Sequence, residues 1–245
     1  MNQGKTVKLP YGPKIYLPEN LESLYENFEP ITSSLICEIL RNGGDFVDVG
    51  ANIGWYTVIG ASILQKSGMV YSIEPNPDVL PVLHRNIEGM ENITVFETSV
   101  GLRNGRADFF LTADTVNSGL YPGPFSSNLS TKIEVAIDCL DTLIANPGRV
   151  RVVKIDVQGD EIDVLRGAEK VLEKKDLTLI CEWAPEWMRN TGADPDFLPV
   201  YLREMGFELS IIDEWLGRRM SIEEFYFELD KDFSRKRFCN ILATK

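Results

Sequence analysis

Histidine and cysteine are scarce in this sequence. Its 245 residues include one histidine, His84, and four cysteines that lie far apart, Cys37, Cys139, Cys181 and Cys239. No Cys-x-x-Cys or Cys–His pair has the spacing of a zinc site. Three of the cysteines sit inside apolar runs, which is typical of buried thiols. We therefore expect reduced cysteines and no zinc site of that kind.

Long hydrophobic runs are also missing. The longest uninterrupted apolar stretches have only a few residues, far short of the roughly 20 that span a bilayer. The first residues, MNQGKTVKLPYGPK, lack the apolar core of a secretory signal. We expect a cytoplasmic protein without a membrane span.

Positive charge is in short supply. The chain has 25 Lys and Arg residues against 37 Asp and Glu residues, a net charge of −12. Such a surface repels the phosphates of nucleic acids and anionic lipids unless a local basic patch attracts them. The longest basic cluster, Arg235–Lys236–Arg237, directly follows an acidic stretch. We expect no nucleic-acid partner, while the oligomeric state stays open.

Short β-rich runs alternate with helical patterns along the chain. This alternation predicts an α/β domain, a parallel sheet flanked by helices. With 44% apolar and 25% charged residues, the composition is that of an ordinary globular domain. The expected strands are 45–49, 69–74, 93–98, 150–156, 177–182, 207–212 and 238–244, and the expected helices are 31–42, 54–65, 78–88, 160–173 and 196–205.

We expect a single domain over residues 1–245 with three additions to this alternation. The first is an N-terminal extension and helix, 1–44. The second, 105–140, is an inserted β-hairpin whose loop, 113–131, is rich in Ser, Asn, Gly and Pro. Loops of that length are more often functional or mobile than merely connective. The third is an insertion before the last strand, 213–235, which we expect to form a helix over the sheet edge.

The segment 45–55, DFVDVGANIGW, carries the strongest ligand signal. A buried strand ends near Asp48, turns through Gly50 and enters a helix at Gly54, where free N–H groups face the ligand side of an open sheet. The next strand ends in Glu74, whose carboxylate can accept hydrogen bonds from both hydroxyls of an adenosine ribose. The turn reads G-A-N-I-G and lacks the third glycine of a dinucleotide site. Asp48 suits the ammonium of a methionine moiety and opposes a pyrophosphate, so we favour S-adenosylmethionine over NAD.

Three linked motifs give the chain a family resemblance: DFVDVGANIGWYTV, then YSIEPNPDVLPVLHRNI, then VVKIDVQGDEIDVLRGAEKVL. In this order they resemble the FkbM family of S-adenosylmethionine-dependent O-methyltransferases, from about Leu35 to Trp183. The resemblance implies a Rossmann-like class I methyltransferase fold with helices on both faces of a seven-stranded, mostly parallel sheet whose last strand is antiparallel. It also implies methylation of a hydroxyl on a sugar, a glycosylated compound or another small natural product.

The resemblance assigns roles by position. The methionine-side loop would consist of Asp48, Gly50, Ala51, Asn52 and Gly54; Glu74, followed by Pro75, would hold the ribose; and Thr98, Ser99 and Val100 would line the adenine. Asp156 and Glu161 would face the methyl group and the acceptor. Two positions depart from the family pattern, because Gln158 stands where an acid or a small residue is usual and Asp160 where a small residue is common.

Methyl transfer to a hydroxyl requires alignment and removal of a proton. His84 falls in a helix away from the strand ends, which leaves carboxylates and lysine. Asp156 ends a strand at the ligand edge, as a base, a methionine contact or a metal ligand. Lys154 points to the same face, either as a base or as the partner of an acid in a buried ion pair. Glu161 begins the next helix, where capping is the alternative to a catalytic role.

Glu182 and Trp183 end the neighbouring strand. Asp156 and Glu182 together could hold a divalent ion, or Glu182 could bind the substrate through hydrogen bonds. The flat faces of Trp183 and Trp187 suit sugar rings, with core packing as the alternative.

The leading hypothesis is therefore an S-adenosylmethionine-dependent O-methyltransferase acting on a saccharide or glycosylated small-molecule hydroxyl. A non-catalytic subunit that binds S-adenosylmethionine is the first alternative, and an NAD-dependent oxidoreductase is the second. The need for a divalent metal and the identity of the acceptor stay open.

Overall fold

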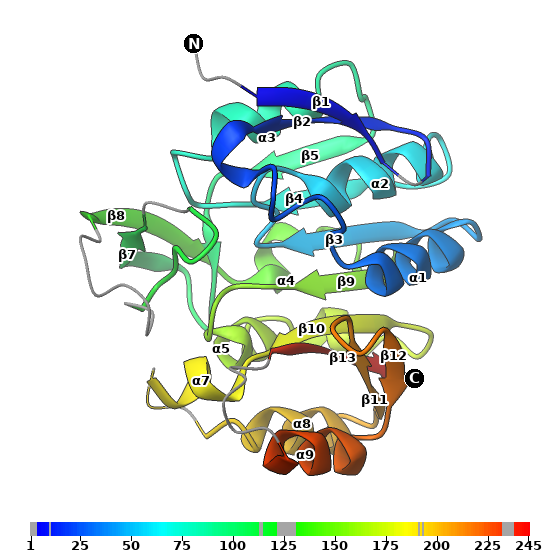
Figure 1. Ribbon diagram of the computed structural model, residues 1–245, viewed down its shortest axis with the longest axis vertical. Coiled ribbons are helices and arrows are strands. Elements are labelled where there is room, and N and C mark those ends of the chain that lie inside the picture. The colour runs from blue at the N-terminus through cyan, green and yellow to red at the C-terminus, as the bar shows by residue number, and fades with distance from the viewer. Residues whose placement is uncertain are drawn as a thin grey trace.

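The computed structural model describes residues 4–9, 11–112, 115–121, 131–190, 192, 194–231 and 238–245. Within these residues the largest sheet has eight strands in the order β12-β11-β13-β10-β9-β3-β4-β5 (Figure 1). In chain order the strands are β3 (Asp45–Val49), β4 (Val70–Ile73), β5 (Ile93–Phe96), β9 (Val150–Ile155), β10 (Thr178–Trp183), β11 (Glu208–Asp213), β12 (Arg218–Met220) and β13 (Cys239–Thr244).

The direction of the strands matches a class I methyltransferase sheet. Strands β5, β4, β3, β9 and β10 are mutually parallel, and the last strand, β13, is antiparallel to its neighbours β10 and β11. The expected α/β fold with an antiparallel last strand is confirmed, but the expected count of seven strands is wrong by one. The eighth strand, β12, lies in the 213–235 insertion, where only a helix was expected; its three residues, Arg-Arg-Met, pair with β11.

The central strands are buried on both faces, as a parallel sheet covered by helices requires. In β3 every residue is buried. Alternate residues enter two different cores: Phe46 packs on one face with α1 (Pro30–Leu40) and α2 (Trp55–Leu64), while Val47 packs on the other. The second face is covered by α4 (Leu140–Leu143), α5 (Glu161–Arg166), α6 (Glu169–Leu172), α7 (Pro185–Asn190), α8 (Phe197–Glu204) and α9 (Ile222–Lys231).

The expected helix 160–173 is two helices, α5 and α6, separated at Gly167. A Cβ atom at this glycine would lie 2.1 Å from the backbone oxygen of Gly101. The chain therefore needs glycine where the helix passes close to the segment after the third parallel strand.

The N-terminal extension covers the first face beyond α2. Its hairpin, β1 (Gly4–Lys8) and β2 (Lys14–Pro18), leads through the short 3₁₀ helix Glu19–Leu21 towards α1. Strand β2 is joined to α3 (Leu80–Asn86) because Asn86 accepts a hydrogen bond from the backbone N–H of Tyr16 (2.7 Å) and donates one to its carbonyl (3.1 Å).

The inserted hairpin forms a sheet of its own. Strands β7 (Gly105–Leu111) and β8 (Thr131–Asp138) pair antiparallel, and β6 (Ser99–Val100) joins β8. In Figure 1 this small sheet lies on the side towards which the arrowheads of β3, β5 and β9 point. The insertion thus stands beside the carboxyl ends of the parallel strands. A second 3₁₀ helix, Pro147–Arg149, leads into β9. In the part of the chain that is described, no helix is long and apolar enough to cross a membrane.

Candidate active site

A cavity of about 420 Å³ lies at the carboxyl ends of the parallel strands. Strand register explains why its polar residues meet: Val49 of β3 pairs with Ile73 of β4 and with Ile155 of β9, and Ile155 pairs with Cys181 of β10. The residue that follows each of these four therefore lies at the same edge. These residues are Gly50, Glu74, Asp156 and Glu182, and all of them line the cavity.

The two glycines of the turn after β3 are required by close packing within the protein itself. Gly50 has φ 80° and Gly54 has φ 87°, both in the left-handed region. A Cβ atom at Gly50 would lie 1.9 Å from the backbone oxygen of Asp156, and one at Gly54 would lie 2.7 Å from Leu83. Close packing against β9 and α3 thus accounts for these glycines. The turn between them, Ala51 and Asn52, lines the cavity as expected.

Two buried carboxyls flank this turn. Asp48 accepts a hydrogen bond from the Thr57 hydroxyl (2.6 Å), and burial raises its pKa to about 6. Glu74 accepts one backbone N–H on each oxygen, from Asn52 and Asn76 (both 2.8 Å), and burial raises its pKa to about 7. Each of these oxygens keeps acceptor capacity for a ligand. Pro75 follows Glu74 in the cavity wall.

The side-chain nitrogen of Asn76 is buried without a hydrogen-bond partner. The residue is 1% exposed and lines the cavity two positions after Glu74. A buried amide that lacks a partner is costly. A ligand bearing an oxygen acceptor here would satisfy it.

Residues 98–100 form the wall next to Glu74. Thr98, Ser99 and Val100 all line the cavity. The Thr98 hydroxyl donates a hydrogen bond to Asp138 (2.9 Å) at the end of β8. Val100 supplies an apolar surface of the kind that an adenine ring packs against.

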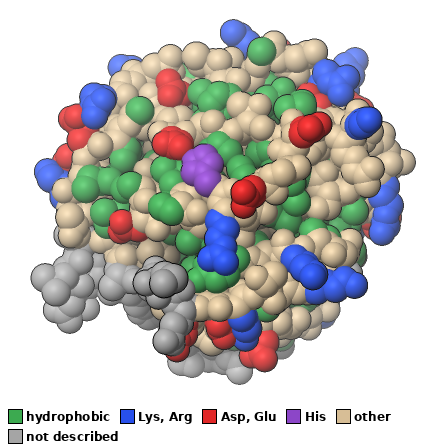
Figure 2. Space-filling view, turned by 90° about the horizontal axis from the view of Figure 1, so that it is seen from above, with side chains coloured by type: hydrophobic (Ala, Val, Ile, Leu, Met, Phe, Trp, Pro, Cys, Tyr) green, Lys and Arg blue, Asp and Glu red, His purple; other side chains and the backbone are tan. Residues whose placement is uncertain are grey.

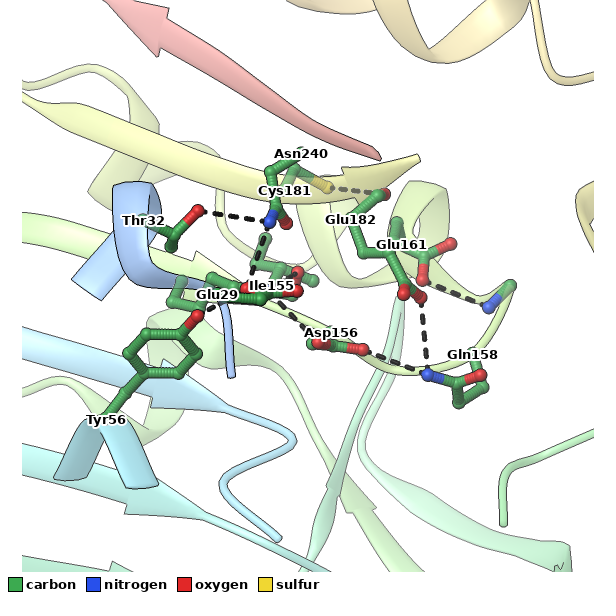
Figure 3. A network of polar contacts seen from close by, with 12 residues as sticks. Glu29, Thr32, Tyr56, Ile155, Asp156, Gln158, Glu161, Cys181, Glu182 and Asn240 are labelled. Carbon is green, nitrogen blue, oxygen red and sulfur yellow. Dashed lines mark hydrogen bonds and ion pairs between the residues drawn. The ribbon is translucent and has the colours of Figure 1, made fainter. Parts of the chain in front are cut away.

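The second half of the cavity contains a linked group of side chains from β9, the turn after it and β10 (Figure 3). Asp156 accepts hydrogen bonds from the Lys154 ammonium on one oxygen (3.1 Å) and from the Gln158 amide on the other (3.0 Å). The same Gln158 nitrogen lies 3.3 Å from an oxygen of Glu182. Gln158 has φ 61°, a left-handed conformation in which the turn directs its amide back between the two acids.

Lys154 is a buried cation surrounded by acids. Its side chain is 1% exposed, and its ammonium lies 5.7 Å from the centre of the Tyr56 ring. Burial alone would lower its pKa, but Asp156, Glu29 and Glu182 together raise it above the ordinary value. Lys154 therefore holds its proton firmly. Its surroundings suit the ion-pair role and not that of a base.

Glu29, the residue before α1, is a further buried acid of this polar group. Its carboxylate accepts hydrogen bonds from the Tyr56 hydroxyl and from the Asn240 amide (3.1 Å). Figure 3 shows both donors converging on it from different elements. Burial raises the pKa of Glu29.

Three of the expected site residues, Gly54, Glu161 and Trp183, do not line the cavity. Glu161 is 1% exposed and accepts a hydrogen bond from the Gly159 N–H (3.0 Å) behind the cavity wall, where burial raises its pKa to about 7. Its neighbour Asp160 lines the cavity instead, with a pKa that burial raises to about 8. Trp183 is 0% exposed and donates its indole N–H to the Pro195 carbonyl (3.0 Å). The expectations that Glu161 faces the acceptor and that Trp183 binds it are corrected; the Trp187 side chain lies outside the described residues.

His84 lies at the surface, as expected for a helix residue. Figure 2 shows the histidine on an outer face with acidic side chains near it. It contacts Glu97 (2.9 Å), and its side chain is 49% exposed. Within the described residues, no group of three or more His, Cys, Asp or Glu side chains could hold a metal ion.

Sequence reasoning missed the N-terminal wall of the cavity. Tyr25, Phe28 and Glu29 line it together with Trp55 and Tyr56. The Tyr25 and Trp55 ring centroids are 5.3 Å apart, and those of Phe28 and Trp55 are 5.5 Å apart. The signal that could have found them is the cluster of aromatic and acidic residues immediately before α1.

Proteins similar in sequence to this chain are methyltransferases. A family model described as "Methyltransferase FkbM domain" matches residues 48–209. The hexuronic acid methyltransferase AglP of Haloferax volcanii is 30% identical over 189 residues, which are 71% of this chain and 70% of that protein.

Solved structures show the same fold. A methyltransferase FkbM from Methylobacillus flagellatus superposes with a TM-score of 0.53 at 16% identity, over 82% of this chain and 44% of that one. A protein of Streptococcus mutans in complex with S-adenosylhomocysteine superposes with a TM-score of 0.52 at 10% identity, over 88% and 96% of the two chains. The family match and the 30% identity over most of the chain show that this protein belongs to the FkbM family of methyltransferases.

Proposed function

We propose that the protein transfers a methyl group from S-adenosylmethionine to a hydroxyl of a saccharide or a glycosylated small molecule. The observation that carries the proposal is the Asp156 carboxylate, held between Lys154 and Gln158 in the same cavity as Asp48 and Glu74. The name of the Haloferax relative, a hexuronic acid methyltransferase, supports a sugar acceptor.

The residues present fit S-adenosylmethionine, which when bound supplies an electrophilic methyl group on a sulfonium. Asp48 would receive the ammonium of the methionine moiety. Glu74 would accept hydrogen bonds from the ribose hydroxyls, and the Asn76 side-chain nitrogen, which has no hydrogen-bond partner, would donate to a ligand oxygen. Residues 98–100 would line the adenine.

Asp156 is the residue that we assign to proton removal. It would take the proton of the acceptor hydroxyl as the oxygen bonds to the methyl carbon. The Lys154 ammonium stabilises the carboxylate before the proton arrives, and the Gln158 amide fixes its orientation. Glu182, beside it on β10, would accept a hydrogen bond from a second hydroxyl and so align the sugar.

The atoms that face the space between Asp156 and Glu182 do not suit a divalent cation. A bridging Mg²⁺ or Mn²⁺ requires oxygen ligands from both carboxylates. Here the Gln158 amide directs N–H groups into that space, at 3.0 and 3.3 Å from the two acids. We therefore propose transfer without a bridging metal, and activity that disappears with a chelator and returns with Mg²⁺ would contradict this.

The test is a methyl-transfer screen over saccharides and glycosylated metabolites with mass detection. We expect at least one product that carries one added methyl group, that depends on S-adenosylmethionine and that is lost in Asp156→Asn. Thermal-shift measurements run alongside, because a ligand of the native state raises the melting temperature. S-Adenosylhomocysteine should stabilise the protein and NAD should not. Stabilisation by adenosylhomocysteine without transfer to any acceptor would favour a non-catalytic binding subunit.

A further inference from the structure

One large aromatic side chain stands exposed beside the cavity. Trp215, in the turn between β11 and β12, is 72% exposed, whereas Trp55 and Trp183 are buried. Single apolar residues are common on protein surfaces and need no explanation by themselves. Two further features set this tryptophan apart.

The first feature is continuity with the cavity. The Trp215 ring lies 6.4 Å from the ring of Phe238, edge to face. Phe238 is itself 40% exposed and lines the cavity. Strand register places both at the edge that carries Glu182, because Glu182 pairs with Asn240 on β13 and Asn240 pairs with Ile212 on β11. An aromatic surface therefore runs from the cavity wall out to Trp215.

The second feature is a rigid turn. The buried Asp213 carboxylate accepts the backbone N–H groups of Trp215 (3.0 Å) and Leu216 (2.9 Å). The adjacent Glu214 carboxylate accepts the N–H groups of Ile31 (3.1 Å) and Thr32 (2.7 Å) in the first turn of α1. Two acids thus hold the turn in place. A preorganised aromatic face loses little conformational entropy when a ligand packs on it.

The size of the cavity indicates what packs there. Cavities of about 300–1,000 Å³ enclose one drug-sized ligand, and this one measures about 420 Å³. S-Adenosylmethionine is itself such a ligand, so little room remains for more than the reacting end of the acceptor. The rest of an acceptor longer than one sugar must lie at the rim, where Phe238 and Trp215 are exposed.

We infer that Trp215 and Phe238 form an outer subsite that stacks a second sugar ring of the acceptor. The acceptor is then an oligosaccharide or a glycoside of at least two rings. The C–H face of a pyranose is apolar and packs on aromatic faces, while its hydroxyls stay in water. This inference rests on the proposed saccharide acceptor and extends it.

The test measures saccharide affinity by calorimetry with saturating S-adenosylhomocysteine. The probes are a neutral series (glucose, cellobiose, cellotriose) and an acidic series (galacturonic acid and its di- and trisaccharide). In at least one series we expect affinity to rise about tenfold from one ring to two. Trp215→Ala should abolish this gain without changing the affinity for the single sugar, and Trp215→Tyr should keep most of it. Phe227→Ala removes another exposed aromatic, on α9, and should keep the gain.

Four results would overturn the inference. Equal affinity for one and two rings in both series would remove the outer subsite while leaving the proposed function intact. The same would hold if Trp215→Ala kept the full gain, or if Phe227→Ala lost it equally. Binding of adenosylhomocysteine but of none of these saccharides would contradict the saccharide acceptor, and the outer subsite with it.

Discussion

Replacing Asp156 by Asn separates chemistry from folding. The substitution keeps the shape of the side chain and one oxygen to accept the Lys154 hydrogen bond, but it removes the negative charge and the capacity to take a proton. If Asp156 is the base, kcat should fall about 10²–10⁴-fold, the contribution usual for a positioned acid–base group. This corresponds to roughly 3–5 kcal/mol of transition-state stabilisation.

The effect of this substitution on stability should be smaller. Removing one partner of a buried ion pair costs about 3–5 kcal/mol when the remaining charge is uncompensated. Here the Lys154 ammonium still interacts with Glu29 and Glu182, and the Asp156 side chain is 21% exposed. We therefore expect a loss of about 1–2 kcal/mol, or roughly 2–8 °C in melting temperature for a domain of this size.

The matched control is Asp45→Asn. Asp45 is also buried and paired, with Arg149 (3.3 Å), but it lies at the opposite end of β3 from the cavity. We expect a similar loss of stability with kcat unchanged. Initial rates at saturating acceptor and cofactor, together with melting curves for both variants, complete the comparison. Full turnover by Asp156→Asn would refute the base assignment, and equal loss of kcat in both variants would make the effect structural.

Three further outcomes follow from the cavity. Glu74→Ala should weaken S-adenosylhomocysteine by about 1–3 kcal/mol in calorimetry, since a charged acceptor is lost; unchanged affinity would mean that the ribose lies elsewhere. Gln158→Ala removes the donor shared by Asp156 and Glu182, so the Asp156 carboxylate loses the contact that fixes its orientation and kcat should fall; an unchanged kcat would count against this role of Gln158. Burial raises the pKa of Glu74 to about 7 and of Asp160 to about 8. Both exceed the unfolded values, so the folded state binds these protons more tightly and the ligand-free melting temperature should fall as pH rises from about 5 to 8; a flat or rising curve would contradict these assignments.

The inner half of the site was predictable because the relevant signals are local. Each of Asp48, Glu74 and Asp156 stands at or just after the end of a buried apolar run, and the carboxyl ends of neighbouring parallel strands meet at one edge. Register then brings them together without further information. Glu182 follows by the same logic on β10.

The expectation that Trp183 faces the cavity was wrong, although the alternation of side chains along its strand already gives the reason. Successive residues of a strand point to opposite faces, so Glu182 and Trp183 could not both face the cavity. The direction of the Glu161 side chain depends on the turn before α5, where Gln158 and Gly159 have φ of 61° and 104°. Such a turn rotates the following carboxylates in a way that residue spacing does not show, and it brings Asp160 to the cavity.

The remaining differences come from tertiary packing. Tyr25, Phe28 and Glu29 reach the cavity only because the N-terminal segment folds over α2, and no periodic pattern marks that path. Strand β12 consists of Arg218, Arg219 and Met220, without the alternation that indicates a strand. It forms by pairing with β11 across a tight turn.

The most direct test of the whole account is transfer of a labelled methyl group. Wild-type protein, Glu74→Ala and Asp156→Asn would each be incubated with trideuteromethyl S-adenosylmethionine and a panel of saccharides, and the products identified by mass and by the position of the label. The account predicts one labelled methyl ether on a sugar hydroxyl, formed by the wild type. Glu74→Ala should form it only at raised cofactor concentration, and Asp156→Asn should scarcely form it at all. A label found on a carboxyl or a nitrogen, or equal product from wild type and Asp156→Asn, would contradict it.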